Sequence, residues 1–233
     1  MKIHFDHSFG RTTDMDVSFS NVWAEVNHDE LTYAPTMGWL PDEWDPPKWF
    51  TGRQVRLDLR QFNGKHKYPR NLHYALIEVG QISYSRLDRI WDNYIESRRY
   101  TDHLEYHRTL EYQPEHKRLV LVYDRQKIVA FSILRIWPIF VSLQFAWNYH
   151  EPKLSVGRHT QYYEMSYAKT HNIKYNYLCP GYETNCIWKS NFPGFQWWDG
   201  SKWQTDKERY ERLCERDSQL RNIFELDNIS TEI

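Results

Sequence analysis

Between His150 and Lys189 lie most of the side chains whose types and spacing suit chemistry. The stretch "HEPKLSVGRHTQYYEMSYAK" predicts a turn followed by an amphipathic helix. A helix N-terminus carries unpaired N–H groups and a partial positive charge, so this junction favours an anion such as a phosphate. Gly157 permits close backbone approach, and Arg158 can add a charge-assisted contact to one phosphate. The alternative is that Gly157 is a plain turn residue before a helix.

The hydrophobic pattern predicts the elements that position this turn. Apolar runs broken by turn residues predict strands near 119–123, 128–137 and 139–147, which form an antiparallel meander. A helix over 158–170 and a strand over 173–178 follow. A strand–helix–strand unit after a meander predicts an α/β fold with a central mixed sheet flanked by helices.

Further helices are predicted before and after this core. Apolar residues recur at i, i+3, i+4, i+7 and i+8 from Leu87 to Ile95, which is typical of an amphipathic helix. The other face of that helix is charged, and is either solvated or a patch for a phosphate-bearing substrate. Residues 101–113 also have a helical pattern, and 205–224 predicts a terminal helix.

The first 75 residues have little periodicity and many turn formers. The segment Tyr33 to Phe50 holds four prolines and three tryptophans, which predicts an extended loop pinned by aromatic rings. Trp39, Trp44 and Trp49 are either core residues on a neighbouring face or a stacking platform for a sugar or a nucleobase.

Composition limits the classes of protein to consider. The 233 residues are 40% hydrophobic and 26% charged, which excludes a wholly disordered chain. The formal net charge of −1 excludes a broad basic footprint for nucleic acid, so any polyanion must meet a local patch. No apolar run approaches about 20 residues and the N-terminus lacks a signal core, so we expect a cytoplasmic protein with neither a membrane nor DNA as partner.

Three cysteines cannot all pair within one chain. Cys179, Cys186 and Cys214 contain no two-residue-spaced pair. We therefore expect reduced thiols and no metal site, since tetrahedral zinc sites usually show tight paired spacings.

The order of meander, turn, helix and strand resembles the N-acetyltransferase (GNAT) superfamily. More closely, the region from about Leu119 to Trp203 resembles the C-terminal domain of arginyl-tRNA–protein transferases. The matching elements are an acidic-Pro step, a Ser-x-Gly-Arg turn, a helix with Glu and Ala-Lys, a Tyr-rich strand and a Tyr, Cys and Lys after it. They stand at Glu151 and Pro152, Ser155, Gly157 and Arg158, Glu164, Ala168 and Lys169, Tyr175 and Tyr177, and Tyr182, Cys186 and Lys189.

The resemblance implies a donor and an acceptor. It implies aminoacyl transfer from an aminoacyl-tRNA to an amine, either a peptide N-terminus or a small molecule, without a cofactor. Acyl-CoA enzymes of the superfamily usually have a loop with two small residues that wraps a diphosphate, whereas "LSVGRHT" offers a single glycine. Acetyl-CoA is the alternative donor. The family's N-terminal cysteine-containing domain has no counterpart in residues 1–80.

The resemblance also implies roles for individual residues. Amide formation needs a deprotonated amine and a polarised carbonyl, so Glu151 is predicted to accept the proton and Tyr182 to orient the carbonyl or protonate the leaving oxygen. Ser155, Gly157, Arg158, Glu164 and Lys189 are predicted to bind substrate. Glu164 is otherwise an exposed helix residue, and Cys186 is a buried thiol rather than a nucleophile.

The sequence thus predicts a single GNAT-like domain over 1–233. It comprises an aromatic-rich irregular elaboration at 1–80, an acyltransferase-like core at 81–203 and a C-terminal helix and tail at 204–233. The rival functions are a CoA-dependent N-acyltransferase on the same fold and a non-catalytic protein that binds a ligand through its Trp-rich loops. Fold alone does not decide among them.

Overall fold

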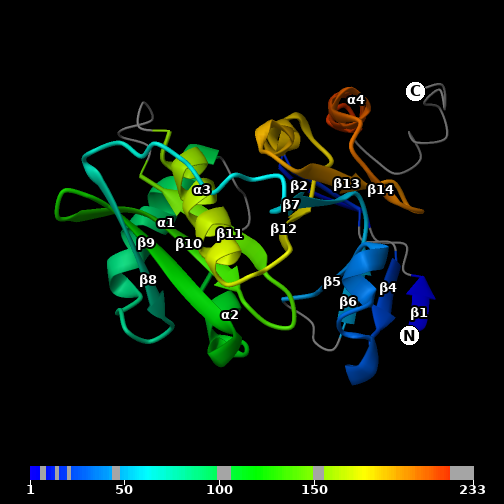
Figure 1. The fold of residues 1–233 in the computed structure, drawn as a ribbon, viewed down its shortest axis with the longest axis horizontal. Coiled ribbons are helices and arrows are strands. Elements are labelled where there is room, and N and C mark those ends of the chain that lie inside the picture. Colours follow the sequence, from blue (N-terminus) through cyan, green and yellow to red (C-terminus); the bar gives the residue numbers. More distant parts are fainter. Residues whose placement is uncertain are drawn as a thin grey trace. The chain divides into compact units, whose positions relative to one another are not determined.

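The computed structural model of the chain describes residues 1–5, 9–13, 16–19, 22–43, 48–98, 106–148 and 155–220. They form two compact units (Figure 1). Unit 1 combines Met1–Asp58 with Tyr177–Ile233, and unit 2 is Leu59–Asn176. That the chain 1–233 is a single domain stays a prediction. Equilibrium unfolding tests it, because a single domain unfolds in one cooperative transition.

Unit 2 is built on a sheet with the strand order β12-β11-β10-β9-β8. Strands β8, β9, β10 and β11 pair antiparallel with their neighbours, so the meander predicted from the hydrophobic pattern is confirmed. β12 begins in unit 2 and ends in unit 1. The bounds are β8 Leu72–Glu78, β9 Lys117–Asp124, β10 Lys127–Arg135, β11 Val141–Trp147 and β12 Tyr175–Pro180.

Two long helices cover opposite faces of the unit 2 sheet (Figure 1). Alternate residues of a strand point to opposite faces, and β9 shows this directly. Its Leu119 and Leu121 belong to the cluster under α1, whereas Val122 packs with Val156 of α3. The helices of unit 2 are α1 Ser85–Arg98, α2 Tyr106–Glu111, η3 Pro114–His116 and α3 Val156–Thr170.

Unit 1 contains strands from both ends of the chain. One sheet has the order β1-β4-β6-β5, β2 pairs with β3, and the strands around β7 have the order β14-β13-β7-β12. The bounds are β1 Lys2–Phe5, β2 Phe9–Thr13, β3 Asp16–Phe19, β4 Val22–Glu25, β5 Trp39–Pro41, β6 Lys48–Thr51, β7 Gln54–Asp58, β13 Phe195–Trp198 and β14 Trp203–Gln204. The helices are η1 His28–Glu30, η2 Ala34–Met37, η5 Thr184–Asn191 and α4 Lys207–Asp217.

The aromatic N-terminal segment is more regular than its composition suggested. Between Tyr33 and Phe50 the structure has η2 and the antiparallel pair β5 and β6 rather than one extended loop. Trp39 and Trp49 are buried in one cluster with Ala24 and Ala34, so they are core residues and form no stacking platform. Trp44 lies outside the described residues.

The predicted α/β class with helices flanking a central sheet is confirmed.

Candidate functional site

A bulge in β11 turns one serine toward α3. Ile133 of β10 pairs with Gln144 and the next residue, Leu134, pairs with Ser142, so Leu143 is an extra residue in β11. Phe145 lies against Gly157 of α3, and strict alternation from it would turn Ser142 to the α1 face. The extra residue changes the phase of the strand, as bulges commonly do beside functional sites. Ser142 therefore reaches Glu164.

Glu164 of α3 lies in a polar cluster between the helix and the sheet. Glu164 is 2% exposed, and its Oε2 accepts a hydrogen bond from Ser142 Oγ. Ser132 also hydrogen-bonds to the carboxyl group. Gln161 is buried on the same helix, and within the described residues its Nε2 has no hydrogen-bond partner. The alternative that Glu164 is an exposed helix residue is therefore wrong.

The cluster contains a directional chain of hydrogen bonds. Ser142 Oγ also lies 3.1 Å from Asn176 Oδ1, but a hydroxyl has one proton and cannot donate to both oxygens. Asn176 Nδ2 is buried without a partner among the described residues. Turning the Asn176 amide by half a rotation satisfies both groups, because Nδ2 then donates to Ser142 Oγ and Ser142 donates to Glu164.

Burial sets the protonation of Glu164. Removal from water disfavours the carboxylate and raises the pKa of Glu164 to about 7, although the hydrogen bonds from Ser132 and Ser142 oppose the shift. A carboxyl group with a pKa near 7 exchanges protons readily at neutral pH. Strongly shifted groups of this kind are candidates for general acid–base catalysis.

The first turn of α3 carries the predicted anion site. Ser155 is the N-cap residue in the left-handed region at φ 48°, and within the described residues its side chain makes no capping hydrogen bond. The first turn contains no acidic residue, and Arg158 is exposed. Gly157 lies in the helix against β11, where an added Cβ would be 3.0 Å from Phe145 Cε1. Gly157 therefore permits close packing of helix on strand.

Tyr182 and Lys189, the other predicted site residues, belong to unit 1. Tyr182 is buried, its hydroxyl accepts a hydrogen bond from Arg53 N at 3.0 Å, and burial raises its pKa. Lys189 is also buried, and its Nζ donates to Pro180 O at 2.6 Å and to Cys179 O at 3.4 Å. These contacts hold the turn after β12. Glu151 and Pro152 lie outside the described residues.

Tyr182 lines a cavity of 380 Å³ in unit 1. Its other walls come from the turn after β6, from β13 and from α4, and are Thr51, Gly52, Arg53, Trp197, Trp198, Asp199, Gly200, Arg209 and Leu213. The volume is in the range of small-molecule sites. Asp199 accepts hydrogen bonds from Ser201 N and Lys202 N, so it serves the turn after β13.

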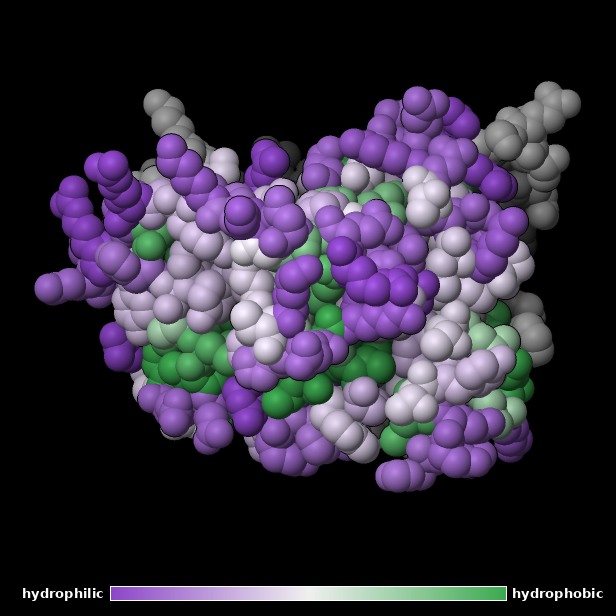
Figure 2. Space-filling model, viewed as in Figure 1, coloured by the Kyte–Doolittle hydropathy of each residue, from purple (hydrophilic) through white to green (hydrophobic). Residues whose placement is uncertain are grey.

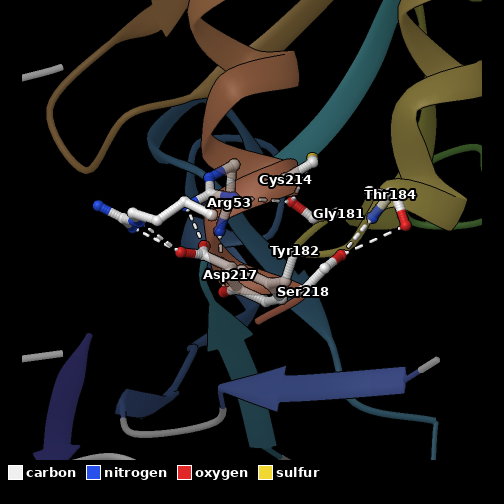
Figure 3. A network of polar contacts seen from close by, with 8 residues as sticks. Arg53, Gly181, Tyr182, Thr184, Cys214, Asp217 and Ser218 are labelled. Carbon is white, nitrogen blue, oxygen red and sulfur yellow. Dashed lines mark hydrogen bonds and ion pairs between the residues drawn. The ribbon is translucent and has the colours of Figure 1, made fainter. Parts of the chain in front are cut away.

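A buried ion-pair network supports this cavity (Figure 3). Asp217 of α4 accepts from Arg53 at 2.6 Å through Oδ2 and from Arg216 through Oδ1. Arg53 in turn donates its backbone N–H to Tyr182. The network joins the start of β7, the turn after β12 and the end of α4.

The thiols show no sign of activation. Burial raises the pKa of Cys179 to about 11 and that of Cys214 to about 11, and it also raises the pKa of Cys186. All three cysteines are free. Within the described residues no group of three His, Cys, Asp or Glu could hold a metal ion, and no helix is long and apolar enough to cross a membrane.

Several residues of the Glu164 cluster were not predicted from the sequence. Ser132 and Ser142 are ordinary strand residues in the pattern, and Gln161 and Asn176 carry no motif. The usable signal in the sequence is the position of the two serines. Ser132 and Ser142 interrupt apolar strands that pack on α3, and a polar residue inside such a strand needs a buried partner.

Comparison with known proteins gives distant likenesses. No protein-family model matches the chain, and no curated protein matches its sequence. Among solved structures, L-PGS from Bacillus licheniformis is 15% identical at a TM-score of 0.45, covering 69% of this chain and 56% of its own. A GCN5-related N-acetyltransferase from Kribbella flavida is 14% identical at a TM-score of 0.39, covering 55% of this chain and 48% of its own.

A third similar structure is the C-terminal domain (DUF2156) of a proposed lysylphosphatidylglycerol synthetase from Agrobacterium fabrum. It is 14% identical at a TM-score of 0.43, covering 56% of this chain and 46% of its own. The chain thus spans about half the length of these structures. Likenesses at this level carry no argument about activity. None of these three structures is an arginyltransferase, so the resemblance to arginyl-tRNA–protein transferases rests on the sequence motifs alone.

Proposed function

We propose that the chain is an acyltransferase in which Glu164 accepts the proton of the acceptor amine. One observation carries this proposal: Glu164 is a buried carboxyl group with a pKa of about 7, hydrogen-bonded to a serine that is only half-buried. An amine reacts as its free base, after the ammonium proton has passed to water, and its nitrogen must lose one further proton as it attacks the carbonyl. A base with a pKa near the working pH suits this task.

The proton passes through Ser142, because Glu164 itself is sealed from solvent. As the amine nitrogen attacks the ester carbonyl, its proton moves to Ser142 Oγ while the proton of Ser142 moves to Glu164. The C–O bond of the ester then breaks, and the same proton returns through Ser142 to the leaving oxygen. The products are an amide and an alcohol, and both residues end in their starting states.

The start of α3 supports binding of a phosphorylated donor. The helix N-terminus, to which the Ser155 side chain gives no capping hydrogen bond within the described residues, and the exposed Arg158 favour one phosphate group. We take the donor to be an aminoacyl-tRNA and the acceptor an amine such as a peptide N-terminus, as the sequence motifs imply. The runner-up donor is acetyl-CoA. Ser155 keeps the substrate-binding role predicted from the sequence, and Glu151 is the alternative base. The roles predicted for Tyr182 and Lys189 stay separate proposals, since both residues belong to unit 1.

The first experiment compares two serines that both contact Glu164. Ser142 is half-buried, whereas Ser132 is buried. If the proton passes through Ser142, Ser142→Ala lowers the rate of transfer from charged tRNA to an amine while Ser132→Ala keeps most of it. Glu164→Gln lowers the rate by about 10²–10⁴-fold, the usual contribution of a general base. Equal rates for Ser142→Ala and Ser132→Ala would contradict proton transfer through Ser142. A Glu164→Gln variant with wild-type activity would contradict Glu164 as the base.

The roles of the remaining predicted residues are tested separately. Glu151→Gln and Tyr182→Phe in the same assay report whether a second base or a hydroxyl donor is needed. Loss of activity in Glu151→Gln together with full activity in Glu164→Gln would show that Glu151, as predicted from the sequence, is the base.

The cavity of unit 1 favours a second candidate function, a binding protein without catalysis. Its walls include two tryptophans, a tyrosine and two arginines, and its volume suits a small ligand. A thermal-shift screen against charged tRNA, acetyl-CoA and simple glycans separates the candidates, because a ligand of the folded state raises the melting temperature. Glycan binding without transfer from either donor would support this second function.

A further inference from the structure

Positive charge is concentrated in two segments of unit 2. From Leu59 to Ile77 the chain contains four Lys or Arg residues and no Asp or Glu. Along α3 the acidic residue is Glu164, which is buried, so this helix presents no carboxylate to solvent. The exposed face of α1 in the same unit instead alternates Arg86 and Arg89 with acidic residues. A local excess of this kind stands out in a chain of net charge −1.

The two segments pack against each other. His66 Nε2 lies 2.7 Å from His159 Nδ1, and the His66 ring stacks on Tyr162 at 3.8 Å. Lys169 Nζ donates to Leu59 O at 3.1 Å and to Phe62 O. The segment before β8 is therefore held along α3, and Figure 1 shows it crossing near the start of that helix. We call the exposed charges the basic face: Lys65, Lys67, Arg70 and Arg158.

Half-buried aromatic rings belong to the same two segments. Tyr68 Oη lies 3.4 Å from Ser166 Oγ, and its ring packs against Tyr74, which stacks on Tyr163 at 4.9 Å. Burial lowers the pKa of both His66 and His159, so the positive charge near pH 7 comes from the lysines and arginines. Figure 2 shows hydrophilic side chains along the upper edge of unit 2.

We propose that the basic face binds the phosphate backbone of a folded RNA. This inference rests on the proposed function, because it supplies the contact for the body of a tRNA donor whose reacting end lies at α3. Exposed cations on two segments that present no carboxylate of their own to solvent complement a polymer of phosphates. The neighbouring acidic residue is Asp124 of β9, which accepts a hydrogen bond from Asn71 at 2.9 Å. An anionic membrane fits less well: none of the exposed large apolar side chains of the described residues lies in 59–77 or 155–176.

The test uses an uncharged RNA hairpin, so that binding is measured without transfer. Fluorescence anisotropy follows a labelled hairpin with a single-stranded 3′ end over a series of salt concentrations. The variant Lys65→Ala/Lys67→Ala removes two charges from the basic face. Its matched control, Arg86→Ala/Arg89→Ala, removes two exposed charges from α1 of the same unit. Circular dichroism and thermal unfolding confirm that each variant is folded.

We expect Lys65→Ala/Lys67→Ala to weaken RNA binding by at least about 10-fold at 0.1 M salt and to lower the salt slope by about 2, the value for two lost phosphate contacts. The control should stay within about 2-fold of the wild-type protein. Equal losses in both variants would overturn the basic face as the binding surface. Binding to phosphatidylglycerol vesicles but not to the hairpin would overturn RNA as the partner.

Failure of this inference is distinguishable from failure of the proposed function. If the hairpin binds through the basic face but no donor is used, the surface stands and the acyltransferase proposal falls. If transfer from charged tRNA proceeds and Lys65→Ala/Lys67→Ala binds RNA like the wild-type protein, the acyltransferase proposal stands and this inference falls.

Discussion

Ser142 Oγ donates a hydrogen bond to the Glu164 carboxylate across the interface between β11 and α3. The contact depends on the bulge at Leu143, which turns Ser142 to the face that α3 covers. A buried acid of α3 with a raised pKa thus meets a half-buried hydroxyl of β11, and the first turn of the same helix is the proposed phosphate site. Each of these features makes a measurable prediction.

The raised pKa of Glu164 makes stability depend on pH. Between the ordinary pKa of a glutamate and about 7 the folded state holds a proton that the unfolded state has lost, so stability falls as pH rises through this window. Glu164→Gln mimics the protonated side chain. We expect it to be more stable than the wild-type protein at pH 8, by up to about 3 kcal/mol, and similar to it at pH 4.

Urea unfolding at both pH values measures this difference. Glu96→Gln is the matched control, because Glu96 is exposed on α1 of the same unit and its replacement should change little at either pH. If Glu164→Gln is destabilised equally at pH 4 and pH 8, the pKa of Glu164 is the same in the folded and unfolded states, and the residue cannot be a base with a pKa near 7.

Arg158 should act on donor binding and hardly on stability. It is exposed in the first turn of α3, so Arg158→Ala is expected to change the free energy of unfolding by less than about 0.5 kcal/mol. Binding of the donor should weaken, and the slope of log affinity against log salt should fall by about one phosphate contact. Arg86→Ala is the control. An unchanged salt slope in Arg158→Ala would separate this arginine from the phosphate.

The Arg53–Asp217 pair should dominate the stability of the cavity walls. Asp217 is 2% exposed as a side chain and is shared by Arg53 and Arg216. Asp217→Asn leaves the buried guanidinium of Arg53 without its counter-charge, which typically costs about 3–5 kcal/mol. Glu78→Gln breaks the exposed pair with Arg118 and should cost less than about 1 kcal/mol. Similar small losses in both variants, measured by denaturant unfolding, would show that the buried pair is not needed.

The cysteines should react slowly in the folded protein. Burial raises the pKa of all three thiols, so little thiolate exists near pH 8. Labelling with a chromogenic disulfide should modify three thiols promptly in denaturant and far more slowly without it. Prompt labelling of one thiol in the native protein would contradict this prediction and make that cysteine a candidate nucleophile. Stoichiometric zinc or a native disulfide would contradict the prediction of reduced, metal-free thiols.

The sequence predicts the core of unit 2 well because its apolar residues form clear patterns. Apolar runs broken by turn residues identify β9, β10 and β11, and the i, i+3, i+4 pattern identifies α1. The helix predicted over 158–170 begins two residues earlier, at Val156. Such elements bury whole faces, so the period of the apolar residues decides them.

The N-terminal half of unit 1 is harder to predict, because its strands are short and β7 pairs with strands distant in the chain. β7 lies between β13 and β12, which belong to the other end of the sequence. Strands of three or four residues such as β5 and β6 show no measurable alternation.

The candidate site is predictable only in part. The order of Ser155, Gly157 and Arg158 before a helix is readable, since helix starts have local signals. The burial of Glu164 and its contact with Ser142 depend on a single bulge at Leu143, for which the sequence has no marker. A shift of one residue reverses which face a strand side chain occupies.

Transfer of a labelled amino acid from charged tRNA to an amine acceptor is the most direct test of the central claim. The assay is run on the wild-type protein and on Glu164→Gln across pH 5.5–8.5, with labelled acetyl-CoA as the parallel donor. We predict transfer from charged tRNA whose rate rises with pH through about 7, the pKa of Glu164, and a Glu164→Gln variant that is slow at every pH. Transfer from acetyl-CoA alone, or a Glu164→Gln variant with the rate and pH profile of the wild-type protein, would contradict the account.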